Sequence, residues 1–356
     1  MEDLALLEAM LAIPSPSGQE EALAAYLIRQ MTVRGFRAER DEAGNVIGEI
    51  GDPEAEREIV LLGHMDTVPG PIPIREEGGR LYGRGAVDAK GPLAAFVLAA
   101  ARVAPRLRGV RLIVIGAVEE EAHGRGARHL ARSRPAPDCV IIGEPSDWQG
   151  ITLGYKGLLS FDYRLVQPGG HSAGEIPGPA EKAVRLWNNL MMYAASYNAG
   201  RSGRFDTLDP ALRDFCTSGD GLRDSASMSV AVRLPPGLQA ADLRRRIERW
   251  GNGADLHFYP SDPPFRTEKN TPPVRALLRA IRAAGGRPRF KLKTGTSDMN
   301  IVGPAWGCPI VAYGPGDSAL DHTPDEHIEI AEFHRAVEVL TQALTFLGNS
   351  PARARR

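Results

Sequence analysis

The sequence predicts an α/β protein in which helices cover both faces of a mostly parallel sheet, with an α+β unit inserted into it. Up to Ile142, short apolar runs alternate with helical patterns. Wholly apolar runs are typical of strands buried on both faces, and their alternation with helices indicates a parallel sheet. After that point the strand pattern changes to alternating apolar and polar residues, as in a half-exposed antiparallel sheet.

The first part of the chain supplies the expected sheet and its covering helices. Apolar residues at helical spacing predict a helix over residues 4–11, which the loop 14–18 ends. A second helix is expected over 19–34, with Gly35 as its C-cap. The remaining expected elements are strands at 45–50, 59–62, 111–117 and 139–142, with helices beginning at residues 91 and 124.

The middle of the chain reads as a separate unit with a βαββαβ-like order of about 110 residues, within the usual size range of a domain. Its expected elements are strands at 158–166, 226–234 and 255–259 and helices at 179–195 and 240–250. The chain then returns with a helix at 274–284, strands at 290–292 and 308–313, and a closing helix at 330–347. We therefore expect one domain formed by residues 1–155 and 265–356, and a second, inserted domain formed by residues 156–264.

Composition narrows the classes of function. The formal net charge is −1, so no overall field points to nucleic acid or membrane partners. The cysteines Cys139, Cys216 and Cys308 are few and far apart, which suits a reducing cytosol without disulfides. The acidic start of the chain shows no signal peptide, and no apolar run reaches the roughly 18 residues of a membrane span. The sequence predicts a cytoplasmic protein.

Polar side chains follow the expected parallel strands where each strand ends. His64 and Asp66 follow one apolar run, the glutamates 119–121 follow a second, and Glu144 follows a third. Asp88 comes after a Gly-Arg-Gly turn and before a helix. Taken alone, His64 reads as the cap of a strand and Asp88 as the cap of a helix. Together they favour a metal site, because ligands bind outside the carboxyl ends of parallel strands and both groups suit zinc.

These residues could hold two divalent ions. A pair of ions about 3.5–4 Å apart needs a bridging carboxylate, terminal imidazoles and carboxylates, and a shared water. Asp88, His64, Glu144, His322 and one of the glutamates 119–121 supply that set. A neighbouring glutamate outside the metal shell could then take a proton from the water.

Four motifs, in this order along the chain, resemble the M20 metallopeptidase and deacylase family. This family includes acetylornithine deacetylase, succinyl-diaminopimelate desuccinylase, aminoacylase and glutamate carboxypeptidase, and the resemblance covers nearly the whole chain. The motifs are Gly-His-x-Asp-Thr-Val-Pro at 63–69, Gly-Arg-Gly-x-x-Asp-x-Lys-Gly at 83–91, Gly-Glu-Pro at 143–145 and His-Thr-Pro-x-Glu at 322–326.

The resemblance implies a role for each residue of the expected centre. One zinc ion would be held by His64, Asp88 and Glu144, and the other by Asp88, Glu121 and His322, with cobalt as an alternative metal. Asp66 would support His64, and Glu120 would be the general base. Three adjacent glutamates compete for two roles, however. Aligning the glycine of the family pattern with Gly126 favours Glu120 as the base and Glu121 as the ligand. A one-residue slip would instead make Glu119 the base and Glu120 the ligand.

The resemblance also implies roles for two residues of the insert. His171 matches a histidine that reaches the active site of the partner subunit and hydrogen-bonds the oxyanion, which implies a homodimer. Without the family, it would read as a surface histidine in a turn. Arg233 matches an arginine that can hold a substrate carboxylate, although the preceding Asp-x-Arg pattern is broken by Ala231. The segment 295–298 resembles a loop on the substrate side.

Within the family, the resemblance is nearest to hydrolases that release lysine or ornithine from the γ-carboxyl of the C-terminal glutamate of a small acidic amino-group carrier protein. These act in lysine and arginine biosynthesis. Basic residues at 287–293 and 244–249 could face such a partner. An equally good interpretation is that these arginines are simply solvated on the surface. The alternatives are a small-molecule deacylase or a dipeptidase. The intact set of expected ligands argues against a metal-free scaffold.

Overall fold

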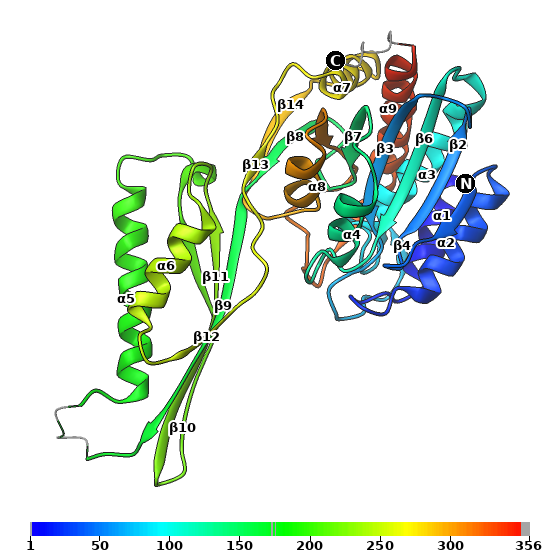
Figure 1. Cartoon of the computed structure of the whole chain (residues 1–356). Helices are drawn as coiled ribbons and strands as arrows, with labels where there is room; N and C mark the ends of the chain where they lie inside the picture. The colour runs from blue at the N-terminus through cyan, green and yellow to red at the C-terminus, as the bar shows by residue number, and fades with distance from the viewer. Residues whose placement is uncertain (1, 172–173, 175, 350–356) are drawn as a thin grey trace. The chain divides into compact units, whose positions relative to one another are not determined.

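The computed structural model describes residues 2–171, 174 and 176–349 (Figure 1). The chain forms two compact units. Unit 1 comprises Met1–Gly154, Thr267–Leu292 and Ser297–Arg356, and unit 2 comprises Tyr155–Arg266 and Lys293–Thr296. The predicted fold class is confirmed, since a largely parallel sheet with helices on both faces and an α+β insert are both present.

The sheet of unit 1 runs in the order β1-β2-β6-β3-β7-β15-β8, with β14 beside β8. Its centre is parallel, because β3 pairs with β6 and β7, and β7 pairs with β15. The central strands are buried along nearly their whole length, as their apolar runs predict. The strands are β1 (Arg37–Arg40), β2 (Val46–Gly51), β3 (Arg57–His64), β6 (Val110–Ala117), β7 (Cys139–Ile142), β8 (Gly150–Tyr155), β14 (Arg289–Lys293) and β15 (Ile310–Ala312).

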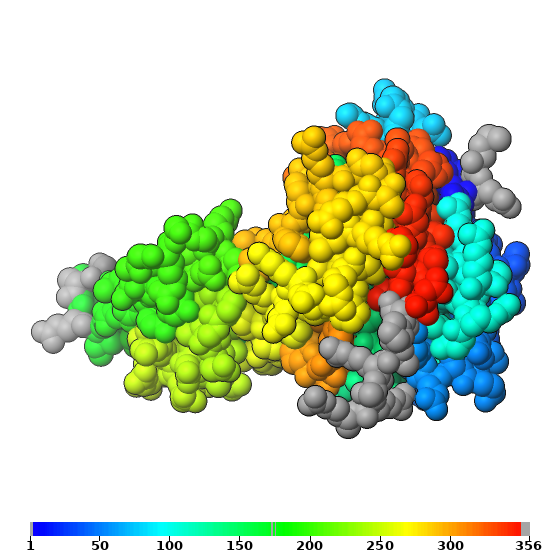
Figure 2. All heavy atoms as spheres, turned by 90° about the horizontal axis from the view of Figure 1, so that it is seen from above, coloured from blue at the N-terminus to red at the C-terminus, as the bar shows by residue number. Residues whose placement is uncertain are grey.

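Helices cover both faces of this sheet. On one face α3 packs against α9 and α1, and on the other α4 packs against α8 (Figure 1). Figure 2 shows α7, in yellow, beside α9, in red, on the surface of this unit. The helices are α1 (Glu2–Leu11), α2 (Glu21–Val33), α3 (Lys90–Val103), α4 (Arg125–Ser133), α7 (Pro272–Ala283), α8 (Met299–Trp306) and α9 (Ile330–Gly348), with the 3-10 turn η1 (Ala104–Arg106) after α3.

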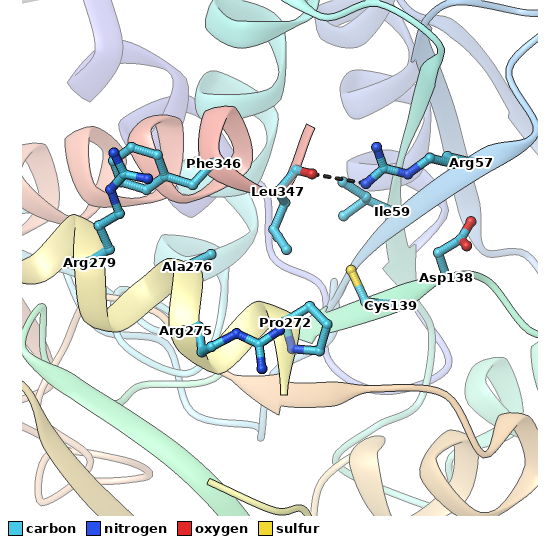
Figure 3. A pocket seen from close by; sticks show the side chains of 10 residues that line it. All are labelled: Arg57, Ile59, Asp138, Cys139, Pro272, Arg275, Ala276, Arg279, Phe346 and Leu347. Carbon is cyan, nitrogen blue, oxygen red and sulfur yellow. Dashed lines mark hydrogen bonds between the residues drawn. The ribbon is translucent and has the colours of Figure 1, made fainter. Parts of the chain in front are cut away.

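The amino and carboxyl ends of the parallel strands have different surroundings. At the amino edge, Arg57 begins β3 and donates hydrogen bonds to the carbonyl oxygens of Leu347, at 2.9 Å, and Gly348, at 3.2 Å (Figure 3). These bonds fasten the end of α9 to the sheet beside a cavity of about 350 Å³. At the carboxyl edge, a small sheet in the order β16-β5-β4 brings the segment before α3 next to the segment before α9. Its strands are β4 (Arg75–Glu77), β5 (Arg80–Tyr82) and β16 (His327–Glu329).

Unit 2 is an antiparallel sheet in the order β10-β11-β9-β12, packed against two helices. Alternate residues of β9 and β11 are buried, among them Phe161 and Val230, and they meet Leu186 and Ile247 from the helices. The elements are β9 (Gly157–Pro168), α5 (Pro179–Asn198), η2 (Arg204–Asp206), β10 (Asp209–Gly219), β11 (Arg223–Leu234), α6 (Ala240–Trp250), β12 (Asp255–Phe258) and β13 (Phe265–Arg266). In the described part of the chain, no helix is both long enough and apolar enough to cross a membrane.

Candidate metal centre

The parallel strands bring the expected ligands to one edge of the sheet. His64 is the last residue of β3 and lies opposite Ala117, the last residue of β6, so the glutamates that follow β6 emerge beside it. Glu144 follows β7, which pairs with β3 on the other side. His64 and Glu144 are buried, as expected for groups at the end of a core strand.

Asp88 lies between two imidazoles. Its Oδ1 is 3.2 Å from Nε2 of His64, and its Oδ2 is 3.2 Å from Nε2 of His322. Nε2 of His322 is also 2.8 Å from Oε1 of Glu121. Ligand atoms of Asp88, Glu121 and His322 all lie within 4.8 Å of one another, a spacing that allows one metal ion. An aspartate with one oxygen toward each histidine is arranged as a carboxylate bridging two ions would be.

The pKa shifts of the histidines reflect the negative charge around them. Hydrogen bonds with Asp88 and Glu121 raise the pKa of His322 to about 10. Burial opposes protonation of His64, but its hydrogen bonds with Asp66 and Asp88 raise its pKa well above the usual value. The converse holds for Asp88, because burial would raise its pKa and the two imidazoles lower it. This cluster of side chains therefore favours positive charge, and its nitrogen and carboxylate donors suit zinc or a similar ion.

The three consecutive glutamates point to different partners. Oε1 of Glu119 accepts a hydrogen bond of 2.8 Å from Nε of Arg125, which belongs to α4. Glu121 meets His322. The side chain of Glu120 makes no hydrogen bond to a described residue, and its pKa is raised well above the usual value by burial and by the charges of Glu144 and Glu121. This arrangement favours the register in which Glu121 is a ligand and Glu120 a base.

Asp66 holds the turn that carries the glutamates. Its carboxylate is fully buried and accepts hydrogen bonds of 3.0 Å from the backbone amides of Glu120 and Glu121 and of 2.7 Å from Oγ of Ser17. Nδ1 of His64 lies 3.0 Å from the backbone oxygen of Asp66 and 3.4 Å from its Oδ1. Support of His64 was expected from the sequence. The bonds to the glutamate turn were not, because backbone amides leave no motif.

The two predicted residues of the insert both lie in unit 2. His171 is exposed, and Ser172 and Ala173 of its motif lie outside the described residues. Arg233 lies near the end of β11, and its Nη1 donates a hydrogen bond of 3.0 Å to Oγ1 of Thr296. Thr296 belongs to the segment that resembles a substrate-side loop. The roles of His171 and Arg233 stay predictions.

The basic strand expected to face an acidic partner is partly neutralised. Oδ2 of Asp147 is 3.1 Å from Nη2 of Arg289 and 2.8 Å from Nζ of Lys291. On α6, Arg244 pairs with Glu248 and Arg245 with Asp242. The free positive charge of both segments is therefore smaller than their sequences suggest.

Asp298 and Glu326 are further charged residues near the centre whose roles the sequence did not predict. Asp298, before α8, is buried, and its charge helps to raise the pKa of Glu120. Glu326 is buried four residues after His322, and it accepts hydrogen bonds from the backbone before α3. Glu326 does belong to the His-Thr-Pro-x-Glu motif, so its position was visible but its function was not.

Comparison with known proteins places this geometry in a family. The sequence pattern of peptidase family M20/M25/M40 matches residues 60–345. The LysW-lysine hydrolase of Deinococcus radiodurans is 47% identical over 350 residues, which cover 96% of each chain. The LysW-lysine/LysW-ornithine hydrolase of Sulfurisphaera tokodaii is 30% identical, over 95% of this chain and 94% of that protein.

Solved structures with little sequence identity share the fold. The M20 family metallo-carboxypeptidase Sso-CP2 of Sulfolobus solfataricus superposes with a TM-score of 0.81 at 19% identity, covering 98% of this chain and 99% of that one. The YXEP protein of Bacillus subtilis, a dinuclear metal-binding peptidase of the M20 family, gives 0.70 at 15% identity, covering 97% and 98%. With motifs, fold and sequence similarity in agreement along nearly its whole length, the chain belongs to peptidase family M20/M25/M40 and is a metal-dependent hydrolase.

Proposed function

We propose that this hydrolase releases lysine or ornithine from the C-terminal glutamate of a small acidic amino-group carrier protein, in lysine or arginine biosynthesis. The observation that carries the proposal is the 47% identity, over 96% of both chains, to a LysW-lysine hydrolase. The relative from Sulfurisphaera tokodaii, which carries both substrates in its name, supports leaving lysine and ornithine as alternatives.

We assign the centre to two zinc ions per subunit, with cobalt as the alternative. One position takes His64, Asp88 and Glu144, and the other takes Asp88, Glu121 and His322. The close approach of His64 and His322 to opposite oxygens of Asp88 supports this division. Metal analysis should find about two ions per chain. Asp88→Ala should lose both, and full activity after exhaustive chelation would contradict the assignment.

The chemistry divides between the ions and the side chains around them. When bound, the two ions supply polarisation of the scissile carbonyl and a water of lowered pKa. Glu120 would act as the general base, taking a proton from the attacking water and giving it to the leaving amine, a role that suits a buried carboxyl with a raised pKa. Asp66 fixes the backbone of Glu120. Arg233 is our candidate for holding the α-carboxylate of the released amino acid.

We assign unit 1 as the catalytic domain and unit 2 as a lid and dimerisation domain of a homodimer. Support comes from β10, which lies at the edge of its sheet and exposes nearly all its residues, including Leu212 and Phe215. Such an edge can pair with a second copy. In the dimer, His171 would donate to the oxyanion in the site of its partner.

Mixing two inactive variants tests this arrangement. His171→Ala and Glu120→Gln subunits should regain partial activity together, because one site of the heterodimer combines an intact base with an intact histidine. Subunit exchange must be shown independently, for example by mass spectrometry of the mixed dimer. Exchange without recovered activity would mean that His171 acts in its own subunit or has no catalytic role.

A small-molecule deacylase is the second candidate, because Asp147 neutralises part of the basic strand expected to meet a carrier. The experiment that separates the two candidates compares kcat/KM for lysyl-carrier protein, acetyl-lysine and acetylornithine. We expect the carrier substrate to be cleaved fastest, with an advantage that falls as salt rises. Equal cleavage of a small substrate, with no response to salt, would favour the deacylase.

A further inference from the structure

Glu326 is the most enclosed carboxylate in the loop that follows His322, with an exposed fraction of 1%. Its Oε1 accepts three backbone hydrogen bonds, from Gly85 and Val87 at 3.0 Å and from Asp88 at 3.1 Å. Three amides turned toward one oxygen form an anion-binding concavity. One of these amides belongs to Asp88, so Glu326 constrains the backbone of the proposed bridging ligand.

Arg84 completes the arrangement on the other oxygen. Its Nη1 donates to Oε2 of Glu326 at 2.7 Å and to the backbone oxygen of Thr323 at 3.3 Å. Its Nε donates to the backbone oxygen of Gly70 at 3.1 Å. Arg84 and Glu326 therefore join three loops, which follow β3, precede α3 and precede β16. The first loop begins directly after His64, the second carries Asp88 and the third carries His322.

The loop that this connection holds carries His322. His322 has a φ of 61°, in the left-handed region that side chains other than glycine rarely adopt, so its loop needs support from its surroundings. Its side chain is half exposed, and its described side-chain hydrogen bonds and ion pairs are those with Asp88 and Glu121. The bond of Arg84 to the backbone oxygen of Thr323, one residue after His322, and the buried bonds of Glu326, four residues after it, attach this loop to the segment that carries Asp88.

We infer that the Arg84–Glu326 pair is a positioning device that sets metal affinity at the Asp88–Glu121–His322 position. The inference rests on the proposed metal centre and adds residues outside its ligand set. Residues that orient metal ligands typically change affinity by about 10–100-fold when they are replaced. The effect should concentrate on one of the two ions, because only that position combines Asp88 with His322.

The test measures metal retention against a chelator, without any substrate. Glu326→Gln places an amide NH₂ against the guanidinium of Arg84, and we expect one zinc ion of the two to be released at about tenfold lower chelator concentration. Adding Arg84→Gln should recover part of the retention, because the amides can then pair. Excess zinc should restore much of the kcat of Glu326→Gln, which a catalytic group would not allow.

Glu329→Gln is the matched control. Glu329 pairs with Arg80 at 2.7 Å, three residues along from Glu326, but both side chains are 47% exposed. This variant should retain both ions like the wild type. If Glu326→Gln misfolds by circular dichroism, Arg84→Gln replaces it, since the three backbone bonds of Glu326 survive and a smaller loss of the same ion is expected.

Wild-type retention in the folded Glu326→Gln and Arg84→Gln proteins, or equal loss of both ions, would overturn the inference. The outcome is separable from that of the proposed function. A wild-type protein that binds two ions but prefers another substrate leaves the inference intact. A wild-type protein that binds no ion at this cluster removes the proposed centre itself, and the inference with it.

Discussion

The two units differ in what they bury. In unit 2, the one buried charged side chain among the described residues is Lys156, and the rest of its core is almost wholly apolar. Unit 1 buries several charged groups close to the carboxyl edge of its sheet, namely Glu20, His64, Asp66, Lys90, Glu144, Asp298 and Glu326. Buried charge costs free energy unless it is paired. The concentration of buried charged groups at this end of the strands therefore indicates a functional site.

The buried charges of the two units also have different partners. Lys156 of unit 2 donates hydrogen bonds to Asp209 and to the backbone oxygens of Arg204 and Thr207. In unit 1, burial raises the pKa values of Glu120 and Glu121, and the charges of nearby carboxylates raise them further. The contacts of Lys156 are those of a residue that stabilises the fold. The carboxyls of unit 1 leave negative charge for a cation to neutralise, which is the physical argument for placing the chemistry in unit 1.

The largest expected effect is on kcat, in Glu120→Gln. The change removes the proton acceptor and keeps the shape of the side chain, so kcat should fall by about 10²–10⁴-fold while both ions are retained. Glu119→Gln is the control, because Glu119 meets Arg125 on the surface of α4, and it should stay near wild-type activity. A metal-replete but inactive Glu119→Gln protein would shift the glutamate register by one.

The next effect is on stability alone. Lys156→Met leaves the carboxylate and carbonyl acceptors of Lys156 unpaired and should lower the free energy of unfolding by up to about 3 kcal/mol. This value is the lower limit of the loss in stability that is typical when a buried ion pair is broken, and it applies because Asp209 is 37% exposed. Denaturant titration measures the loss, and metal analysis provides the contrast, since the ions of unit 1 should remain. Loss of metal in this variant would contradict the separation of structural and chemical charges.

A loss of stability in the same range, together with loss of metal, is expected for Asp66→Asn. Asparagine keeps one acceptor oxygen and turns an NH₂ group toward the remaining donors, at a cost of about 1–3 kcal/mol. Metal content should fall as well, because Asp66 holds the backbone of Glu121. Ser17→Ala is the milder control, because it removes one of these bonds and leaves the two backbone bonds in place.

The pH dependence of the same variant gives a second readout. Burial raises the pKa of Asp66, but the hydrogen bonds and charge of its neighbours, His64 foremost, lower it overall. A lowered folded-state pKa means that the contribution of Asp66 is complete above about pH 4 and is lost as the pH falls further. Asp66→Asn should therefore flatten the acid side of the stability curve. If the stability of the variant falls with acid as it does in the wild type, Asp66 does not cause this pH dependence.

The sequence predicted the parts of the fold that rest on local pattern. The buried strands β3, β6 and β7 are continuous apolar runs, and the polar groups at their ends come together because parallel strands end at one edge. Edge strand β10 was not located, since it exposes nearly all its residues and so lacks a buried alternation. Helix α8 was missed because Gly303 and Pro304 break its pattern.

The contacts around the candidate site were harder to predict than the residues that come together in it. Asp66 and Glu326 act largely on backbone amides, which every residue carries and no motif records. Asp147 neutralises a strand that follows about 140 residues later, and only the folded chain brings the two together. The sequence around Asp147 also gave no sign of this contact, because Asp147 lies in a loop after Glu144 and has a left-handed backbone conformation.

The smallest effect we predict is also the one that tests the carrier substrate. Asp147 offsets the charges of Arg289 and Lys291, so Asp147→Asn should free them and raise kcat/KM for an acidic carrier several-fold at low salt. Asparagine suits this residue because it tolerates the φ of 57° and can still accept the hydrogen bond from the amide of Gln149.

Arg289→Glu should act in the opposite direction on the same substrate, because it reverses a charge that the carrier would meet. Neither variant should alter the cleavage of acetyl-lysine, since Arg289 is an exposed residue outside the proposed metal centre. Raised salt should bring both variants and the wild type to the same rate on the carrier, because exposed charges are screened within about 10 Å at 0.1 M. If the two variants move kcat/KM in the same direction, or move it equally for acetyl-lysine, the basic strand does not guide the carrier.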